Sequence, residues 1–459
     1  MSAINSSIYN EIEISAESTT GKGITLDLRL GVVKFNYFED LFSPTITAQL
    51  LVVSSGNATN KAGDEIETVY SGLPIRGGER VKINIAGNTK SNLPLKFDTP
   101  DTYLYVSNVS RQYSDGAKEI FTLDLVSREA ITNETSRLSE KYKNDVVISD
   151  TVKKIIETKL ASTIDDENLD QTLNTYPFFG NLKTPFHTLV WLASKSIPVK
   201  GLPGYFFYQT KDGFNFRSIE SLIRNGKENP KYQYYERKYT ESSRLVDIDD
   251  DTIISYNVSH NNDLLTKLML GQFSSHIMEF DPLTGYFTTE EQGKFTLNDS
   301  TNQEIRFPKQ QGGEVLETEE VESLGATPEI PVLLDDQKQN LGTLPSRLIT
   351  LVADRGALQR DPSVERGGNV QPTQWQRQII SRYQLLFTQI LNMIVPLNTN
   401  LVVGDIINIK FLNANMESKE HDRRQSGNYM IKSLCHNFDA NQSVTSLTLV
   451  RDTFGEISK

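Results

Sequence analysis

The stretch that decides the fold is residues 401–452, LVVGDIINIKFLNANMESKEHDRRQSGNYMIKSLCHNFDANQSVTSLTLVRD. Apolar side chains alternate with polar ones over residues 407–411 and again over residues 446–449. A period of two is what a sheet with one buried and one solvated face requires. Residues 439–443, DANQS, separate the last two runs and are rich in turn formers. The stretch therefore predicts an antiparallel module of about three strands.

The composition is that of a soluble globular protein. The chain has 459 residues, enough for two to four domains of about 150 residues each. Hydrophobic residues make up 37% and charged residues 23%, so sizeable cores are expected. The net charge of −12 argues against whole-molecule attraction to nucleic acid or to anionic membranes. Cys435 is the only cysteine, which excludes an internal disulfide and fits assembly in a reducing cytoplasm.

No targeting or membrane-spanning segment is expected. The first residues, MSAINS, lack a basic region followed by an apolar core. No apolar run approaches the ~18 residues that a membrane span needs.

Residues 24–127 predict a β-rich region that follows a polar arm at residues 1–20. Apolar residues alternate from Ile24 to Leu30, and Gly31 then shifts the parity, which indicates a β-bulge. Asp115-Gly116 is a hairpin signal. Further strands are expected at residues 46–52, 81–85, 103–106 and 121–126.

Residues 128–248 predict an insert of helices and an aromatic hairpin. One helix covers residues 148–159, with Ser149 or Asp150 as its cap. A second begins at Thr184-Pro185. Its apolar stripe, interpreted as core packing, consists of Phe186, Leu189, Val190, Ala193 and Ile197. Residues 205–219 predict a hairpin that turns at Asp212-Gly213 and is covered on both faces.

The rest of the chain mixes strands with a long polar excursion. Strands are expected at residues 253–258, 267–273 and 275–280. Residues 291–371 predict a largely irregular excursion, with a strand near residues 347–352. A helix beginning at Pro372 and a strand at 391–395 lead into the final module. The apolar face of that helix consists of Trp375, Ile379, Tyr383, Leu386 and Phe387.

No motif for catalysis or metal binding is found. The acidic cluster of Asp247, Asp249, Asp250 and Asp251 lacks the spacing of a calcium loop and is interpreted as a solvated loop. None of the five histidines forms an H-x-x-x-H or H-E-x-x-H pair, and neither G-x-S-x-G nor a phosphate-binding loop occurs.

No residue is therefore predicted to be catalytic, cofactor-binding or metal-ligating. Neighbours in a strand point to opposite faces, so Cys435 and His436 are not expected to form a dyad. Tyr429, His436 and Arg451 are interpreted as packing and interface residues. With 59 acidic residues, a catalytic pair of carboxylates is not excluded by the sequence, although no local signature supports a glycosidase.

Several stretches, taken in order, are similar to one known family. They are YFEDLFSP at 37–44, LPIRGGE at 73–79, LVSRE at 125–129, LSEKY at 138–142, DGFNFRS at 212–218 and the closing stretch with VGD, GNYMI and LTLVRD. Together they resemble the baseplate central hub proteins of contractile-tailed bacteriophages. The similarity covers most of residues 24–290 and 372–452, and residues 291–371 are unmatched.

The resemblance implies a β-rich α+β fold with two tail-tube-like antiparallel β-barrel domains. Residues 1–127 would form the first and residues 128–248 the helical insert. Residues 249–290 together with 388–459 would form the second, which is interrupted by an excursion at 291–387 that ends in a helix. Strands near residues 250–290 are thus expected to complete the module at 401–452.

The resemblance also implies a structural, non-enzymatic role. A homotrimer would present six similar domains and would adapt a threefold central spike to a sixfold tail tube. The implied partners are the tail tube protein and the central spike protein, with tape-measure and baseplate wedge proteins as further candidates. DNA would pass through without specific binding. The implied location is the tail baseplate of the virion, after assembly in the host cytoplasm.

Two alternatives remain: a hub or spike-base protein of a non-phage contractile injection system, and a tail-associated cell-wall hydrolase. The acidic balance leads to a further hypothesis. A channel lined by Asp, Glu and neutral side chains would let DNA slide, because phosphate binding accumulates through Lys and Arg. Exposed strand edges are a second candidate for docking contacts.

Overall fold

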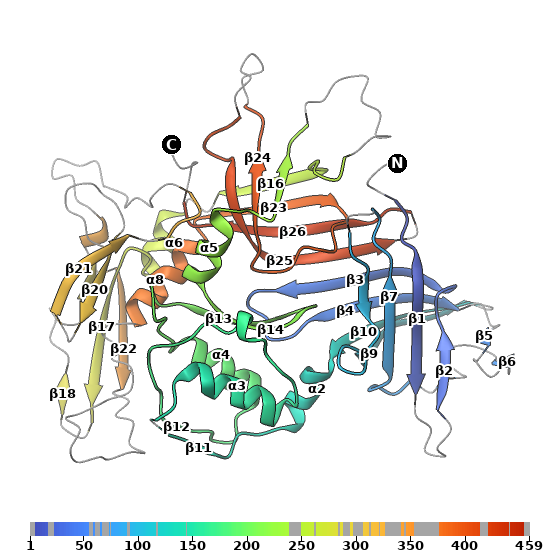
Figure 1. The fold of residues 1–459 in the computed structure, drawn as a ribbon, viewed down its shortest axis with the longest axis horizontal. Helices are drawn as coiled ribbons and strands as arrows, with labels where there is room; N and C mark the ends of the chain where they lie inside the picture. Colours follow the sequence, from blue (N-terminus) through green and yellow to red (C-terminus); the bar gives the residue numbers. More distant parts are fainter. Residues whose placement is uncertain are drawn as a thin grey trace.

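The computed structural model shows a β-rich α+β fold with one large sheet and a few helices (Figure 1). It describes residues 5–16, 23–54, 58–59, 65–66, 73, 75–89, 92–115, 118–143, 145–237, 249–260, 263–282, 285–287, 294–296, 306–311, 314–320, 322–325, 341–343, 346–352, 376–413, 421–439 and 441–453. Pro372 and Trp375 of the expected helix and Asp247 of the acidic cluster lie outside these ranges.

Fourteen strands form the large sheet. Its path runs through β16 (Ser255–His260), β23 (Gln389–Pro396), β26 (Val444–Arg451), β25 (Gly427–Asp439), β3 (Val32–Asp40), β4 (Thr47–Ser54), β10 (Lys118–Ser127), β9 (Leu104–Asp115), β7 (Arg80–Ile85), β1 (Tyr9–Ala16) and β2 (Ile24–Asp27). Beside the path, β24 (Ile406–Lys410) pairs with β25 and with β15 (Tyr232–Tyr235), and β8 (Leu95–Phe97) pairs with β7. The predicted closing module of three strands is confirmed as β24, β25 and β26.

The sheet is open, and this corrects the expectation of two closed barrels. β3 pairs antiparallel with β25, so the N-terminal strands and the C-terminal strands belong to one surface. Within the described residues the path ends at β16 on one side and at β2 on the other. In separate barrels, β3 and β25 would each pair within their own group. Here they pair with each other and so join the two groups. β16 joins β23 as expected, whereas β17 (Ser274–Asp281) belongs to another sheet.

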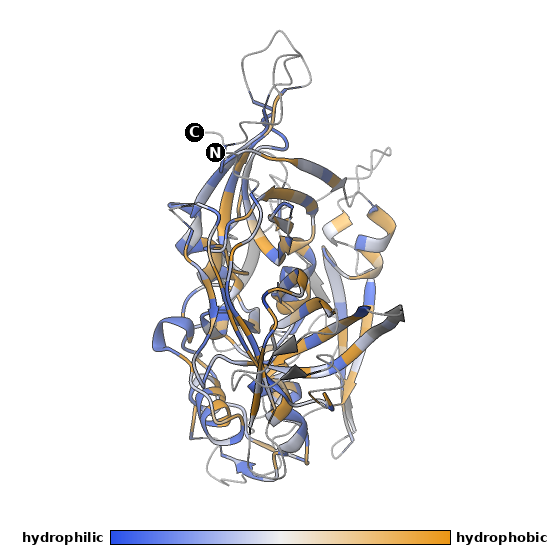
Figure 2. Ribbon diagram, turned by 90° about the vertical axis from the view of Figure 1, so that its right-hand side faces the viewer, coloured by the Kyte–Doolittle hydropathy of each residue, from blue (hydrophilic) through white to orange (hydrophobic). Residues whose placement is uncertain are grey.

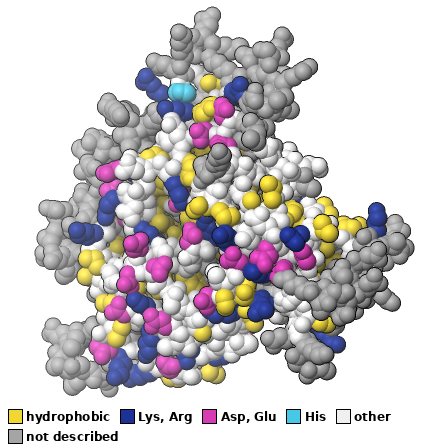
Figure 3. Space-filling view, turned by 45° about the vertical axis from the view of Figure 1, so that its right-hand side comes forward, with side chains coloured by type: hydrophobic (Ala, Val, Ile, Leu, Met, Phe, Trp, Pro, Cys, Tyr) yellow, Lys and Arg dark blue, Asp and Glu magenta, His cyan; other side chains and the backbone are white. Residues whose placement is uncertain are grey.

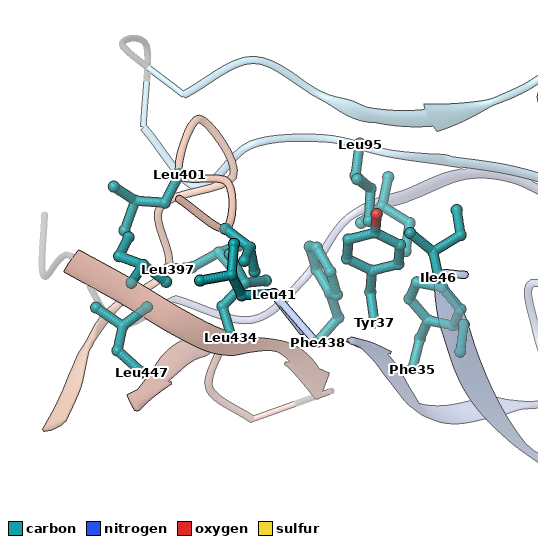
Figure 4. Packing of buried hydrophobic residues seen from close by; sticks show 14 of the residues in the cluster. Phe35, Tyr37, Leu41, Ile46, Leu95, Leu397, Leu401, Leu434, Phe438 and Leu447 are labelled. Atoms are coloured by element: carbon teal, nitrogen blue, oxygen red, sulfur yellow. The ribbon is translucent and has the colours of Figure 1, made fainter. Parts of the chain in front are cut away.

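One hydrophobic core runs under both groups of strands. Hydropathy alternates along many strands, which places apolar side chains on one face (Figure 2). At the junction, Phe35 and Tyr37 of β3 lie with Leu434 and Phe438 of β25 and with Leu401 from the loop before β24 (Figure 4). The ring centroids of Phe35 and Phe438 are 5.8 Å apart. The two strand groups therefore share a packed interior at the junction.

The insert adds a second core below the sheet. Its elements are α2 (Arg128–Thr135), β11 (Lys141–Tyr142), α3 (Ile148–Lys159), η1 (Asp166–Asn168), β12 (Phe178–Phe179), α4 (Pro185–Ala193), β13 (Tyr205–Thr210), β14 (Gly213–Ser218) and α5 (Ile219–Lys227). The hairpin β13–β14 lies between the sheet and the helices α3 and α4 (Figure 1). Every residue of β13 is buried, which confirms that both faces are covered. Phe206 and Tyr208 pack in the core of the sheet, and Tyr205 and Phe207 pack against the helices.

The excursion contains more regular structure than expected. Described elements there and on either side of it are α6 (Leu264–Met269), β17, β18 (Tyr286–Phe287), β19 (Lys294–Thr296), β20 (Arg306–Gln311), β21 (Glu314–Glu320), η2 (Leu341–Thr343), β22 (Arg347–Val352) and α8 (Gln376–Leu386). In the N-terminal region, two short strands, β5 (Ala58–Thr59) and β6 (Glu65–Ile66), form a separate ladder.

The strand expected near residues 347–352 is confirmed as β22, which pairs in parallel with β17. The strand expected at 267–273 is wrong, because Asp263 caps helix α6 by accepting a hydrogen bond from the Thr266 N–H at 3.1 Å.

Smaller expectations are corrected in the same way. The bulge near Gly31 is confirmed as a register shift between Val32 and Lys34, but Leu30 lies in a turn and is fully exposed. Helix α3 has Val147 at its N-cap position, without a side-chain cap, instead of Ser149 or Asp150. Helix α4 has Thr184 at its N-cap as predicted. Of its expected stripe, Val190 is exposed and Ile197 lies beyond the helix end.

Candidate interaction surface

The face of the large sheet that points away from the core carries two rows of polar side chains, with a less polar row that includes Ile394 and Phe38 between them. Directly paired residues of neighbouring strands share a face, so the register defines rows of side chains across the sheet. One row crosses β16, β23, β26, β25 and β3 and consists of Asn257, Asn392, Thr448, Ser433 and Asp40. All five are exposed or half-buried. This row carries one charge and is otherwise made of amides and hydroxyls.

A second row extends the same surface across the junction of the two strand groups. It consists of Asn437, Asn36, Gln49, Asp124 and Asn108, from β25 through β3, β4 and β10 to β9. Gln49 Nε2 donates to Asp124 Oδ1 at 3.1 Å, and Asn108 Nδ2 donates to Asp124 Oδ2 at 3.1 Å. The Oδ1 atoms of Asn36 and Asn437 accept no hydrogen bond from the protein. The surface is therefore continuous from the C-terminal to the N-terminal strands.

Two lysines on this surface each lie beside a carboxylate. Lys34 lies opposite Asp439 in the β3–β25 ladder. Lys432 Nζ binds Asp40 Oδ2 at 2.8 Å. On the side of the molecule drawn in Figure 3, basic and acidic side chains are interspersed rather than gathered in one patch. Lys34 and Lys432 are thus each matched by a carboxylate, whereas Asp124 of the second row has only amide partners.

A hollow of about 540 Å³ lies in this surface over β16, β23, β26, β25 and β3. Its lining includes Phe38, Tyr256, Ile394 and Cys435. Burial raises the pKa of the Cys435 thiol to about 11, so the thiol is protonated at neutral pH. A protonated thiol is a poor nucleophile and a poor metal ligand.

The structure places Cys435 and His436 on opposite faces of β25, as the sequence predicted. His436 is fully buried, with Nδ1 2.9 Å from the Thr445 hydroxyl oxygen. Burial lowers the pKa of His436 to about 3, so its imidazole is neutral. Tyr429 and Arg451 are also fully buried, and the Arg451 guanidinium carbon lies 5.2 Å from the Tyr429 ring centroid. All three residues that were interpreted as packing residues are core residues.

Glu39 is a buried acid that the sequence analysis did not single out. Its carboxylate accepts hydrogen bonds from the N–H groups of Lys211 at 2.8 Å and Val403 at 3.0 Å, and from the Tyr37 hydroxyl at 2.7 Å. Burial raises the pKa of Glu39 to about 7 despite these bonds. The alternation in β3 could have predicted this burial, because Glu39 lies on the same face of the strand as the buried Phe35 and Tyr37.

A buried ionic cluster links the end of β26 to helices α5 and α8. Arg382 of α8 is fully buried and binds Asp452 Oδ2 at 3.1 Å and Glu220 Oε1 at 3.6 Å. Arg382 also donates to the carbonyl of Glu322 at 2.6 Å. The hydroxyl of Ser323 donates to Asp452 at 2.9 Å. No periodic pattern predicts this meeting of four distant segments.

The described residues contain no group of three or more His, Cys, Asp or Glu side chains that could hold a metal ion. Asp249, Asp250 and Asp251 are among these described residues. A helix long and apolar enough to cross a membrane is also absent from the described ranges.

Comparison with known proteins finds similar solved structures, whereas no family model and no curated protein sequence matches the chain. A tail protein from Neisseria meningitidis is 11% identical with a TM-score of 0.48, over 96% of this chain and 97% of that protein. The 43 kDa tail protein of prophage MuSo2 from Shewanella oneidensis is 10% identical with a TM-score of 0.48, over 96% and 98%. An Escherichia coli component of the type VI secretion system is 9% identical with a TM-score of 0.43, over 98% and 80%.

The chain is thus structurally similar along nearly its whole length to tail proteins and to a secretion-system component.

Proposed function

We propose that the chain is a structural, non-enzymatic hub of a contractile phage tail, in which copies form a ring around a channel. The observation that carries the proposal is the continuous outer face of the fourteen-stranded sheet, on which two rows of polar side chains cross from one strand group to the other. A single sheet of this width with one solvated face is suited to lining a wide passage. The sequence resemblance to central hub proteins supports the same role.

The open sheet supports assembly from several copies. In the described residues, β16 pairs only with β23 and β2 pairs only with β1, so each end of the sheet has an unpaired edge. Unpaired edges are templates for contacts between chains. Three copies side by side would present six strand groups, three N-terminal and three C-terminal. In this proposal residues 1–127 and residues 249–290 with 388–459 are the two tail-tube-like units, separated by the insert at 128–248 and the excursion at 291–387.

The polar face also supports passage of DNA without specific binding. Affinity for a phosphate backbone accumulates through Lys and Arg, each of which releases condensed counterions. On this face, Lys34 and Lys432 are each matched by a neighbouring carboxylate, so phosphates would find few unpaired cations. Neutral amides and hydroxyls, rather than the acids expected from the net charge, would form the sliding surface.

The proposed ring would adapt the threefold central spike to the sixfold tail tube in the baseplate of the virion. Its partners would be the tail tube and spike proteins, with tape-measure and wedge proteins as further neighbours.

Light scattering of the purified protein tests the ring directly. We expect a particle of three times the 51.8 kDa chain mass, and electron micrographs with a central opening. A protein that stays monomeric at micromolar concentration would contradict the proposal. Clearing of purified peptidoglycan at substoichiometric protein would instead support the hydrolase.

A further inference from the structure

Four residues of the excursion, Glu322 to Gly325, form a strap that lies between the end of β26 and helices α5 and α8. Leu324 is almost completely buried and belongs to the hydrophobic core of the large sheet. Ser323 is buried as well. The strap itself is neither strand nor helix. It is therefore held by contacts with its surroundings rather than by regular secondary structure.

Two buried groups bind the backbone of the strap. Arg382 donates to the Glu322 carbonyl oxygen at 2.6 Å. Asp452 Oδ1 accepts hydrogen bonds from the Leu324 N–H at 3.0 Å and from the Ser323 hydroxyl at 2.9 Å. Arg382 and Asp452 also bind each other at 3.1 Å, which fixes both groups in position. In peptide recognition, main-chain hydrogen bonds supply affinity and contacts with side chains supply specificity.

The Glu322 carboxylate lies near two cations of α5 at the surface. Its Oε1 atom is 3.8 Å from Arg224 Nε, and its Oε2 atom is 3.7 Å from Lys227 Nζ. All three side chains are partly exposed, so this attraction is modest and depends on salt. Arg224, Lys227, Arg382 and Asp452 are together the strap site. The site fits an acidic residue, a hydroxyl residue and a leucine in that order.

The strap relates to its site as a ligand does. Its partners lie far from it in the sequence, and the nearest of them, Arg382, is 60 positions from Glu322. The three elements around the strap also have core residues of their own. Ile223 of α5, Leu386 of α8 and Val450 of β26 are buried in the core of the large sheet. The site should therefore keep its framework when the strap leaves.

We propose that the strap site is a peptide-binding site, that the strap is its internal ligand, and that a partner protein with a peptide of the same pattern displaces the strap. The ligand class is a short irregular peptide in which an acidic residue, a serine or threonine, and a leucine follow one another. Displacement would separate Glu322 to Gly325 from the end of β26 when the partner docks. This inference does not depend on the proposed ring.

A fluorescein-labelled peptide of residues 319–327, EEVESLGAT, tests the site in the full-length chain. Leu324→Ala weakens the strap, because it removes a buried apolar side chain without adding a charge. The peptide should bind this variant at least tenfold more tightly than the wild type, in which the intact strap competes at an effective concentration in the millimolar range. Leu348→Ala, at a leucine of the excursion that is 73% exposed, is the matched control and should behave like the wild type. Fluorescence anisotropy measures all three chains.

Charge reversal shows whether the peptide lies in the strap site. In the Leu324→Ala chain, Lys227→Glu should weaken peptide binding about threefold at low salt, because it brings a carboxylate toward that of the peptide. A peptide with the substitution Glu322→Lys should regain that loss on the Lys227→Glu chain. If the two charge changes act independently, the peptide binds elsewhere and the proposal is wrong.

Urea unfolding shows whether the strap can be replaced. We expect Leu324→Ala to fold with a lowered midpoint that the unlabelled peptide raises again. A Leu324→Ala chain that does not fold would show that the strap is part of the folding core, which would overturn the proposal. Equal peptide binding by the wild type and Leu324→Ala would overturn it too. Neither outcome affects the hub, because light scattering of the wild type tests the ring separately.

Discussion

At the scale of single residues, Glu39 holds together segments that are far apart in the chain. Its carboxylate receives backbone N–H groups from the tip of the β13–β14 hairpin and from the loop before β24. Three hydrogen bonds partly offset the cost of burying this acid, yet its pKa is still raised to about 7. The ionised form is therefore disfavoured in the folded protein relative to the unfolded chain.

Glu39 should make stability depend on pH in a defined window. The folded pKa of about 7 lies above the ordinary value of 4.5. Between these values the folded chain holds a proton that the unfolded chain has lost, so the free energy of unfolding falls as pH rises. The loss is on the order of 3 kcal/mol. In Glu39→Gln this contribution should vanish when urea unfolding is compared at pH 5 and pH 8.

Glu220, whose pKa is also raised to about 7, is unchanged in that variant and serves as an internal reference. The difference between wild type and variant isolates Glu39. Equal pH slopes for the two proteins would show that Glu39 does not titrate in this range.

Arg382 should be far more important for stability than an exposed arginine with an even shorter ion pair. Arg382→Ala leaves Asp452 buried without its cation, which should lower the free energy of unfolding by about 3–5 kcal/mol. The matched control is Arg29→Ala, because Arg29 pairs with Asp27 at 2.6 Å with both side chains partly exposed. That variant should leave the urea midpoint nearly unchanged, because an exposed ion pair is screened by solvent. Similar urea midpoints for the two variants would contradict the role of the buried cluster.

At the scale of elements, local patterns predicted well where neighbouring residues decide the structure. The hairpin β13–β14, helix α4 and strands β24 to β26 follow from turn residues, a cap and strict alternation. The strand predicted at residues 267–273 is wrong, because a short apolar run fits the period of a strand as well as that of a helix. The Asp263 cap decides for a helix, and its signal is a single residue.

In helix α5, the substitution Gly226→Ala should destabilise the protein, although helix propensity alone predicts the opposite. Alanine normally stabilises a helix by about 1 kcal/mol relative to glycine. A Cβ atom at Gly226 would lie 2.7 Å from the side chain of Ile406 in β24. Gly226→Ala should therefore lower the free energy of unfolding by about 1–3 kcal/mol. Asn225→Ala, at the exposed neighbouring position, should be neutral or slightly stabilising in the same urea titration. A more stable Gly226→Ala protein would show that α5 and β24 pack more loosely.

At the scale of the whole molecule, the sequence predicts which face of a strand is buried but not which strand lies beside it. A period of two is the same whichever partner is chosen. The rows on the polar face could thus be anticipated strand by strand. Their continuity from Asn437 to Asn36 could not, because it depends on the pairing of β25 with β3. The same pairing replaces the two barrels that the family resemblance implied.

The shared core should make both strand groups unfold together. Phe438→Ala removes a fully buried ring at the junction and should cost about 3–5 kcal/mol. Hydrogen exchange should then show weaker protection in β4 as well as in β26. Tyr113→Ala, at a side chain that is 60% exposed, should change neither. Loss of protection in β26 alone would show that the groups are independent domains.

The β3–β25 ladder also has a consequence for synthesis of the protein. Lys432 and Asp40, which are bonded across it, lie 392 residues apart in the chain. At about 5–20 residues per second, β3 leaves the ribosome roughly 20–80 seconds before its partner strand exists. During that interval its edge is unpaired and Phe35 and Tyr37 lack part of their cover. Nascent chains stalled before residue 427 should therefore be cut by protease at β3 and held by chaperones, and released full-length chains should resist both.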